Sequence, residues 1–167
     1  MGCHIQLEQR VAKDDSNYRN NGNVLLDRLL GATLHHYPHG EDETGADRRL
    51  HELADTLSAR GRRPYVIPLA PGHPPLGALG YVRAAVELLR QIDTGGPAID
   101  EIVVASGSGN THAGLLFGLR ALGSPIRVTG VCVRRAAGLQ SVRIRNRCVE
   151  IAALLGVDTP VGEDDIQ

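Results

Sequence analysis

The sequence predicts an α/β protein with mostly parallel strands in a three-layer αβα arrangement. Short runs rich in Val and Ile alternate along the chain with longer segments whose apolar residues recur every three or four positions. Turns containing Gly or Pro separate these segments. Alternation of this kind favours parallel sheets that are covered by helices and joined by right-handed crossovers.

The first part of the chain begins with a predicted strand. Residues 3–11 alternate apolar and polar side chains, and a polar loop follows over 13–21. Asn23 is the expected N-cap of the next helix, which ends before Gly31. The other elements predicted here are a strand at 32–37, a solvated acidic loop at 41–43, an amphipathic helix at 46–59 and a strand at 64–69.

A Pro/Gly-rich loop at 70–75 is the expected boundary between two lobes. Beyond it, Ile102, Val103 and Val104 form an apolar run typical of a strand that is buried on both faces, here over 99–105. The other elements predicted in this part are helices at 76–92, 111–122 and 140–155, a strand at 126–133, and a frayed acidic tail at 158–167.

Length and composition exclude several classes of protein. The 167 residues are enough to bury a core, and a net charge of −1 argues against a nucleic-acid-binding protein. Cys3, Cys132 and Cys148 form no CxxC pair, so neither a disulfide framework nor a zinc site is expected, and Cys132 and Cys148 are expected in the core. Because there is neither an apolar run of about 18 residues nor a signal peptide, we expect a cytoplasmic protein without a membrane contact.

Basic residues are distributed unusually. Eighteen residues are Lys or Arg, and only Lys13 is a lysine, so any chemistry that needs a lysine amine must use it. His35 and His36 should point to opposite faces of a strand, so no metal site is expected there. Five arginines are expected to form a solvated surface, with contact to an anion or another subunit as the alternative: Arg134, Arg135, Arg143, Arg145 and Arg147.

The segment with the clearest chemical meaning is the loop after the strand at 99–105. Five small residues, 106–110, connect that apolar strand to a helix. Backbone N–H groups converge at such a junction, and the helix N-terminus adds positive partial charge, which together favour phosphate. Gly107 and Gly109 allow close approach of the backbone, while Ser108, Asn110 and Thr111 offer side-chain donors. A simple tight turn is the alternative.

Other nucleotide and phosphate motifs fit this loop less well. A Walker A loop requires a lysine before the helix, and none is near. The dinucleotide fingerprint requires a glycine where His112 stands, and Arg134 and Arg135 take the place of the acidic residue after the next strand. An NADP-binding domain therefore remains a weaker alternative.

Four segments occur in the order found in a known enzyme family. They are Gly22-Asn-Val-Leu-Leu-Asp-Arg-Leu-Leu-Gly-Ala32, Pro64-Tyr-Val-Ile-Pro68, Leu76-Gly-Ala-Leu-Gly-Tyr-Val82 and Val104-Ala-Ser-Gly-Ser-Gly-Asn-Thr-His-Ala-Gly114. Together they resemble the D-cysteine desulfhydrase family, which is close to 1-aminocyclopropane-1-carboxylate deaminase and L-cysteate sulfo-lyase. The resemblance implies the two-lobe, tryptophan synthase β-like fold of pyridoxal-phosphate enzymes of fold type II.

The resemblance also implies roles for parts of this chain. Residues 1–63 would belong to the small N-terminal lobe and 64–157 to the large lobe. The activity would convert D-cysteine to pyruvate, sulfide and ammonia, with 1-aminocyclopropane-1-carboxylate or L-cysteate as alternative amino-acid substrates, in a homodimeric full-length enzyme. The 5′-phosphate of pyridoxal phosphate would be held by Gly107, Ser108, Gly109, Asn110 and Thr111.

The sequence also departs from this family. Family members are considerably longer, and the resemblance implies that their Schiff-base lysine lies upstream of the matched region. Lys13 lies between a strand and Asp14 and Asp15, is expected to be solvated, and does not replace that lysine. We therefore expect a truncated chain with no catalytic residue of its own, inactive in isolation. The alternative is a non-catalytic α/β module that binds a phosphate ligand, or a decayed gene product.

Overall fold

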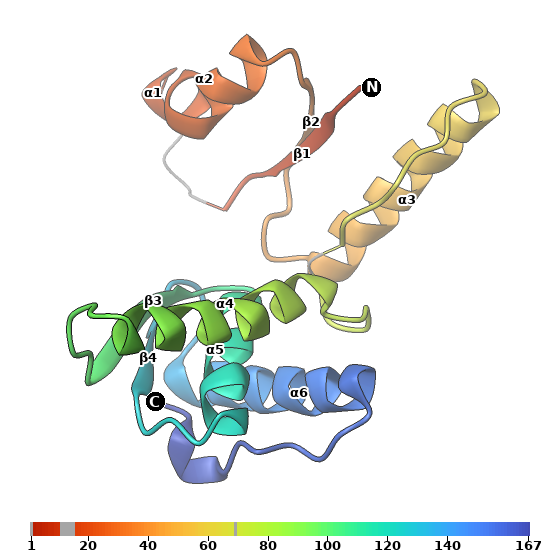
Figure 1. Ribbon diagram of the computed structural model, residues 1–167. Helices are drawn as coiled ribbons and strands as arrows, with labels where there is room; N and C mark the ends of the chain where they lie inside the picture. Colours follow the sequence, from red (N-terminus) through yellow and green to blue (C-terminus); the bar gives the residue numbers. More distant parts are fainter. Residues whose placement is uncertain (1, 11–15, 69) are drawn as a thin grey trace. The chain divides into compact units, whose positions relative to one another are not determined.

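The structure, a computed structural model, describes residues 2–10, 16–68 and 70–167 (Figure 1). The chain divides into two compact units, residues 1–71 and 72–167, and this division falls within the predicted Pro/Gly loop. Within the described residues, each unit contains one parallel pair of strands, which confirms the α/β class and the parallel pairing. The assignment of 1–63 and 64–157 to the two lobes of the family fold stays a prediction.

The first unit is built on β1 (His4–Glu8), which pairs in parallel with β2 (Thr33–Tyr37). Both strands confirm the prediction. The connection between them contains α1 (Ser16–Asn20) and α2 (Gly22–Leu29), and α3 (Glu43–Ala59) follows β2. The short helix α1 replaces the end of the predicted polar loop, of which residues 13–15, with Lys13, lie outside the described residues.

Two helices of this unit begin earlier than the sequence indicates. The N-cap of α2 is Asn21 instead of Asn23, because the Asn21 side chain accepts a hydrogen bond from Gly22 N at 2.8 Å. Asp42 caps α3 by accepting from Gly45 N at 2.8 Å, and the Tyr37 hydroxyl donates to the same carboxylate at 2.9 Å. Glu41 and Asp42 of the acidic segment are therefore exposed before the helix, as expected, and only Glu43 already belongs to α3.

The predicted strand at 64–69 is wrong for the described part of that range. Residues 64–68 form no strand, and the side chains of Tyr65 and Ile67 are exposed. Pro64 and Pro68 have no backbone N–H to donate to a ladder, which disfavours a strand despite the Val and Ile between them. Residue 69 lies outside the described residues.

The second unit confirms the helices and strands that the sequence predicts, with ends shifted by a few residues. Helix α5 lies between α4 and α6 and packs on the sheet (Figure 1). The core is formed largely by α5 and α6, through Leu116, Phe117, Leu119, Ile144 and Ile151. The elements are α4 (Leu76–Asp93), β3 (Glu101–Ser106), α5 (Asn110–Ala121), β4 (Arg127–Cys132), α6 (Ala137–Leu155) and a 3₁₀ turn (Glu163–Asp165).

Helices α4 and α5 approach each other closely because glycines on α5 face α4. A Cβ atom added at Gly114 would lie 2.4 Å from the Ala78 carbonyl oxygen, and one at Gly118 would lie 2.7 Å from the Ala85 Cβ. Both alanines are fully buried. The small residues therefore set the distance between the two helices, and with it the position of α5 on the sheet.

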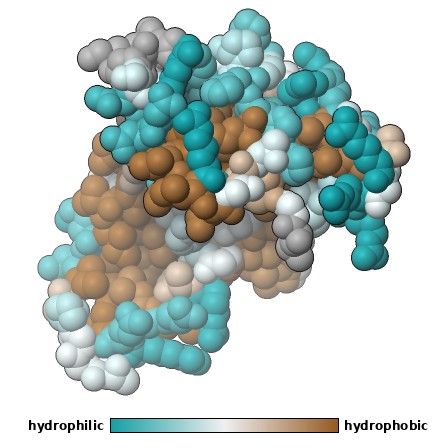
Figure 2. All heavy atoms as spheres, turned by 90° about the horizontal axis from the view of Figure 1, so that it is seen from above, coloured by the Kyte–Doolittle hydropathy of each residue, from teal (hydrophilic) through white to brown (hydrophobic). Residues whose placement is uncertain are grey.

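Strand β3 is not buried on both faces as predicted. Ile102 and Val104 pack against the core, whereas Val103, on the opposite face, is 63% exposed. Cys132, expected in the core, is exposed at the end of β4, and Cys148 is buried as expected. Burial, with a smaller contribution from the charge of Asp165, raises the pKa of the Cys148 thiol to about 12. Large apolar side chains are also exposed elsewhere at the surface (Figure 2).

The C-terminal tail is not frayed. Val161 and Ile166 pack against the core, and Gly130 N donates to the Gln167 carbonyl at 2.9 Å. Asp165 forms an ion pair with Arg120, whose Nη1 also donates to the Ser124 and Ile126 carbonyls. Burial alone would raise the pKa of Asp165, but the hydrogen bonds from Arg120 and from Gly162 N outweigh it and lower the pKa.

The Arg120–Asp165 pair predicts a pH-dependent stability. Because the pKa of Asp165 is lower in the folded state than in the unfolded chain, its ionised form adds stability at neutral pH, which is lost as pH falls through the folded-state value. We expect the free energy of unfolding to fall more steeply between about pH 5 and pH 2 in the wild type than in Asp165→Asn. Urea denaturation at a series of pH values measures this difference.

Glu163→Gln is the matched control for that experiment, because Glu163 pairs with Arg145 in an exposed position two residues away. Its pH dependence should follow that of the wild type, since exposed ion pairs add little stability. Equal slopes for the wild type and Asp165→Asn would contradict a role of the pair in holding the tail.

Over the described residues, no helix combines the length and apolar character needed to cross a membrane. Nor does that part of the chain bring three His, Cys, Asp or Glu side chains together in a way that could hold a metal ion. The His35 ring is hydrogen-bonded to another histidine, since its Nε2 lies 3.0 Å from Nδ1 of His4.

Candidate functional site

The five residues predicted to bind phosphate lie together at one junction of the second unit. Strand β3 ends at Ser106, and α5 begins at Asn110, so Gly107, Ser108 and Gly109 form the whole connection. This connection stands at the carboxyl end of β3, where ligands bind in open parallel α/β sheets. The structure therefore brings all of the predicted site residues to one place, and their role in binding stays a proposal.

Two glycines are required by the geometry of this loop. Gly109 has φ +89°, in the left-handed region, and a Cβ there would lie 3.0 Å from Ile144 Cδ1. A Cβ at Gly107 would lie 3.2 Å from Val133 Cγ2. A larger residue at either position would strain the loop or push it away from these side chains, so the glycines let the loop lie close against α6 and Val133.

The start of α5 offers backbone donors. The helical ladder begins with Ala113 N, which donates to the Gly109 carbonyl at 2.8 Å. The N–H groups before it have no intrahelical acceptor and carry the positive end of the helix dipole. Asn110 N has only a long contact, 3.5 Å, with Ser108 Oγ. This end of the helix can therefore donate to an anion.

A buried polar network supports the loop from below. Gln140 of α6 donates from Nε2 to Ser106 Oγ at 2.9 Å and to the Gly107 carbonyl at 3.2 Å, and Ser106 Oγ lies 3.2 Å from His112 Nδ1. Ser106, His112 and Gln140 are all almost completely buried. Burial lowers the pKa of His112, an effect that the Val128 carbonyl partly offsets, so the ring is neutral at pH 7.

Three of the five clustered arginines are not a solvated surface. Arg135 Nη1 donates to the Gly107 carbonyl at 3.0 Å, and Arg143 Nε donates to the Ser108 carbonyl at 2.8 Å. Arg147 is only 3% exposed, and its Nη1 donates to the His73 carbonyl at 3.1 Å and to Glu150 at 2.6 Å. Sequence reasoning missed these roles, because no local pattern links an arginine to a carbonyl 28 or 35 positions earlier.

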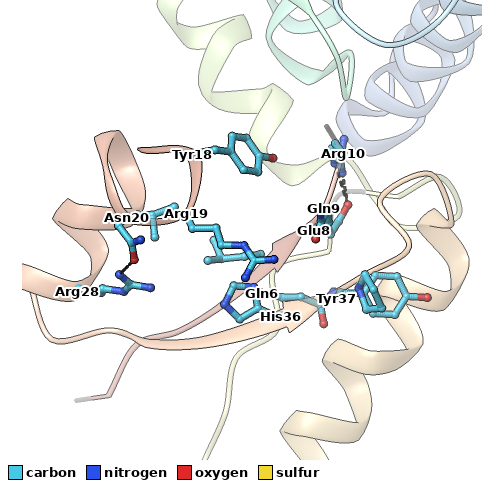
Figure 3. A pocket seen from close by; sticks show the side chains of 13 residues that line it. Gln6, Glu8, Gln9, Arg10, Tyr18, Arg19, Asn20, Arg28, His36 and Tyr37 are labelled. Atoms are coloured by element: carbon cyan, nitrogen blue, oxygen red, sulfur yellow. Dashed lines mark hydrogen bonds and ion pairs between the residues drawn. The ribbon is translucent and has the colours of Figure 1, made fainter. Parts of the chain in front are cut away.

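The first unit contains a cavity of about 820 Å³ that the sequence does not indicate (Figure 3). It lies among β1, β2, α1 and α2, and polar side chains from all four elements line it. Arg28 Nη1 donates to Asn20 Oδ1 at 2.5 Å, and Arg10 forms an ion pair with Glu8. These arginines are thus already engaged by neighbouring side chains of the same unit.

Comparison with known proteins places the chain in a family. Residues 1–166 match the family described as pyridoxal-phosphate dependent enzymes, and the chain belongs to this family. Pyridoxal phosphate is the cofactor of the family. The parallel α/β fold and the small-residue loop before α5 agree with that assignment.

Individual relatives are similar to this chain over most of its length. A D-cysteine desulfhydrase of Yersinia pestis is 37% identical over 96% of this chain and 47% of its own length. A D-cysteine desulfhydrase of Serratia proteamaculans is 37% identical over 93% of this chain and 46% of its own length. A Pyrococcus horikoshii protein provisionally named a 1-aminocyclopropane-1-carboxylate deaminase is 41% identical over 84% of this chain and 42% of its own length.

A solved structure, described as the crystal structure of the ACC deaminase homologue, superposes with a TM-score of 0.71 at 37% identity. The match covers 97% of this chain and 46% of that one. This chain therefore spans about half the length of the relatives it matches.

The residues of the loop fit the phosphate group of this cofactor. The site provides neutral N–H donors at the start of α5, and Gly107 and Gly109 let the loop before that helix lie close against Val133 and α6. Asn110 also has a buried side-chain oxygen without a hydrogen-bond partner among the described residues, and its amide can present Oδ1 or Nδ2 by rotation. Gly107, Ser108, Gly109, Asn110 and Thr111 contribute no acidic side chain.

Proposed function

We propose that this chain contributes the phosphate-binding part of a pyridoxal-phosphate dependent lyase that acts on a small amino acid, with D-cysteine as the first candidate. The observation that carries the proposal is the β3–α5 junction, where Gly109 in the left-handed conformation leads directly into the N-terminus of α5. Membership of the pyridoxal-phosphate family supports it.

In this proposal the loop binds and orients the cofactor through its phosphate. The N–H groups of Ser108, Gly109 and Thr111, together with the Ser108 and Thr111 hydroxyls, would donate to the phosphate oxygens. The bound cofactor would supply the electron sink for the amino-acid chemistry, while the protein fixes its position. The neutral His112 beneath the loop adds no charge of its own to the site at pH 7.

The identity of the substrate is supported by the relatives. The Yersinia and Serratia relatives are named D-cysteine desulfhydrases, and Asp27-Arg28 resembles the desulfhydrase pattern. 1-Aminocyclopropane-1-carboxylate and L-cysteate are the alternative substrates. The homodimer implied by the family resemblance stays a prediction.

We expect the 167-residue chain to bind the cofactor but not to catalyse the reaction by itself. Enzymes that use this cofactor form a covalent bond between the cofactor and a lysine amine. Lys13, the only lysine in this sequence, is followed by Asp14 and Asp15 and is expected to be solvated. The chain should therefore release no more sulfide from D-cysteine than free pyridoxal phosphate does. Sulfide release measured at equal cofactor concentration, with and without protein, tests this.

Two further measurements separate the parts of the proposal. Equilibrium dialysis with pyridoxal phosphate and with pyridoxal, which lacks the phosphate, should show binding of the first only. Borohydride treatment followed by peptide mapping should leave Lys13 unmodified. Sulfide release well above the free-cofactor rate, with Lys13 labelled, would overturn the expectation of inactivity, whereas equal binding of both compounds would overturn the phosphate site.

A further inference from the structure

We propose that Arg143, Arg135 and Gln140 are positioning residues that turn the N–H groups of the 107–109 loop toward the phosphate. This inference rests on the proposed phosphate site and adds three residues that need not contact the ligand. All three side chains come from the β4–α6 region, and all three donate to carbonyl oxygens of the loop.

Because a peptide group is planar, these contacts to the carbonyl oxygens also fix the direction of the N–H groups of the loop. The described chain contains no cis peptide bond, and in a trans peptide the C=O and N–H groups point in opposite directions. The Gly107 carbonyl is held by Arg135 at 3.0 Å and by Gln140 at 3.2 Å, so Ser108 N–H must point away from α6. The Ser108 carbonyl is held by Arg143 at 2.8 Å, so Gly109 N–H must do the same.

The same contacts strengthen the donors that they orient. A carbonyl that accepts a hydrogen bond from a charged guanidinium polarises its peptide, which makes the N–H group of that peptide a better donor. Two consecutive peptides are polarised in this way, and both N–H groups are on the side where the anion would bind. The arginines thus favour an anion through the backbone and keep their own side chains on the far side of the loop.

The loop cannot easily hold this orientation without the side chains. Gly107 and Gly109 have no side chain to restrict rotation of the backbone, and Gly109 already has a positive φ. Without the arginines, the 107–108 and 108–109 peptides can rotate and present carbonyl oxygens, which repel a phosphate. The buried amide of Gln140 supports only the first of the two peptides.

Arg143→Met tests the proposal, because methionine keeps much of the length of the side chain and removes the donor. We expect the dissociation constant for pyridoxal phosphate, and separately for inorganic phosphate, to rise at least about tenfold. In ¹H–¹⁵N spectra of the full chain, phosphate should shift the Ser108 and Gly109 amide signals in the wild type, and the Gly109 shift should be lost in the variant.

Arg145→Met is the matched control, because Arg145 is on the same helix, carries the same charge and pairs with Glu163 instead of the loop. It should change the dissociation constant less than about twofold, since exposed charges are screened. If Arg143→Met does not fold, as judged by circular dichroism, Arg135→Met makes the same test at the Gly107 carbonyl.

The outcomes distinguish this inference from the proposed function. Wild-type affinity and wild-type amide shifts in a folded Arg143→Met or Arg135→Met would overturn the positioning role and leave the phosphate site standing. Equal weakening by Arg145→Met would also overturn it, because the effect would then be one of net charge. A wild-type chain that binds neither pyridoxal phosphate nor phosphate would overturn both.

Discussion

Replacement of Gly114 by alanine is expected to lower the free energy of unfolding of the second unit by about 2 kcal/mol. The added Cβ would lie 2.4 Å from the Ala78 carbonyl oxygen and 2.7 Å from the Tyr81 Cβ, so α4 and α5 would have to separate. Overpacking of this kind costs about 3 kcal/mol at the upper end of its usual range, and the better helix propensity of alanine returns about 1 kcal/mol. Urea denaturation followed by circular dichroism measures the difference.

Gly80→Ala on the facing helix is the control for that experiment. Gly80 is exposed within α4, and no atom lies within 4 Å of an added Cβ. This substitution should stabilise the protein by about 0.5 to 1 kcal/mol, because only helix propensity changes. If Gly114→Ala were as stable as the wild type, the close packing of α4 on α5 would be incorrect.

Replacement of Gly109 by alanine is expected to weaken binding of pyridoxal phosphate by more than about tenfold. Two effects combine at this position, namely a backbone φ of +89° and a Cβ 3.0 Å from Ile144 Cδ1. The strain amounts to about 1 to 3 kcal/mol, and it can be relieved by rotating the backbone that presents the Gly109 N–H. Titration of the cofactor, followed by its absorbance or by calorimetry, measures the loss.

Gly123→Ala separates strain in the backbone from loss of the site. Gly123, just after the end of α5, has φ +70° with no atom within 4 Å of an added Cβ, so it carries similar strain without a contact near the loop. It should lower stability but leave the dissociation constant for the cofactor unchanged. A Gly109→Ala variant that binds as tightly as the wild type would contradict the proposed phosphate site.

Much of the second unit could be predicted because its signals are local. The apolar run Ile102–Val104 predicts β3, and the small residues after it predict a tight junction with the next helix. The same local patterns did not predict which face of a strand is covered by another part of the protein. Val103 is apolar but 63% exposed, because an apolar run indicates a strand and does not show what covers each face.

The N-cap of α2 and the C-terminal segment 158–167 show a second limit of prediction from the sequence. Asn21 and Asn23 are both good N-cap residues, and only the position at which the helix begins decides between them. The acidic composition of 158–167 predicts a frayed tail, but an ion pair between residues 45 positions apart, Arg120 and Asp165, holds it on the core. Composition contains no information on such a pairing.

The sequence by itself determined the α/β class, the order of the elements in the second unit and the place of the candidate phosphate loop, since periodicity and glycine content act over a few residues. Only the tertiary structure decided what surrounds the loop. Arg135, Gln140 and Arg143 meet its carbonyls because β4 lies parallel to β3 and α6 packs on α5, which brings together residues about 30 positions apart. Such contacts depend on how the elements pack in space, and no local pattern in the chain encodes them.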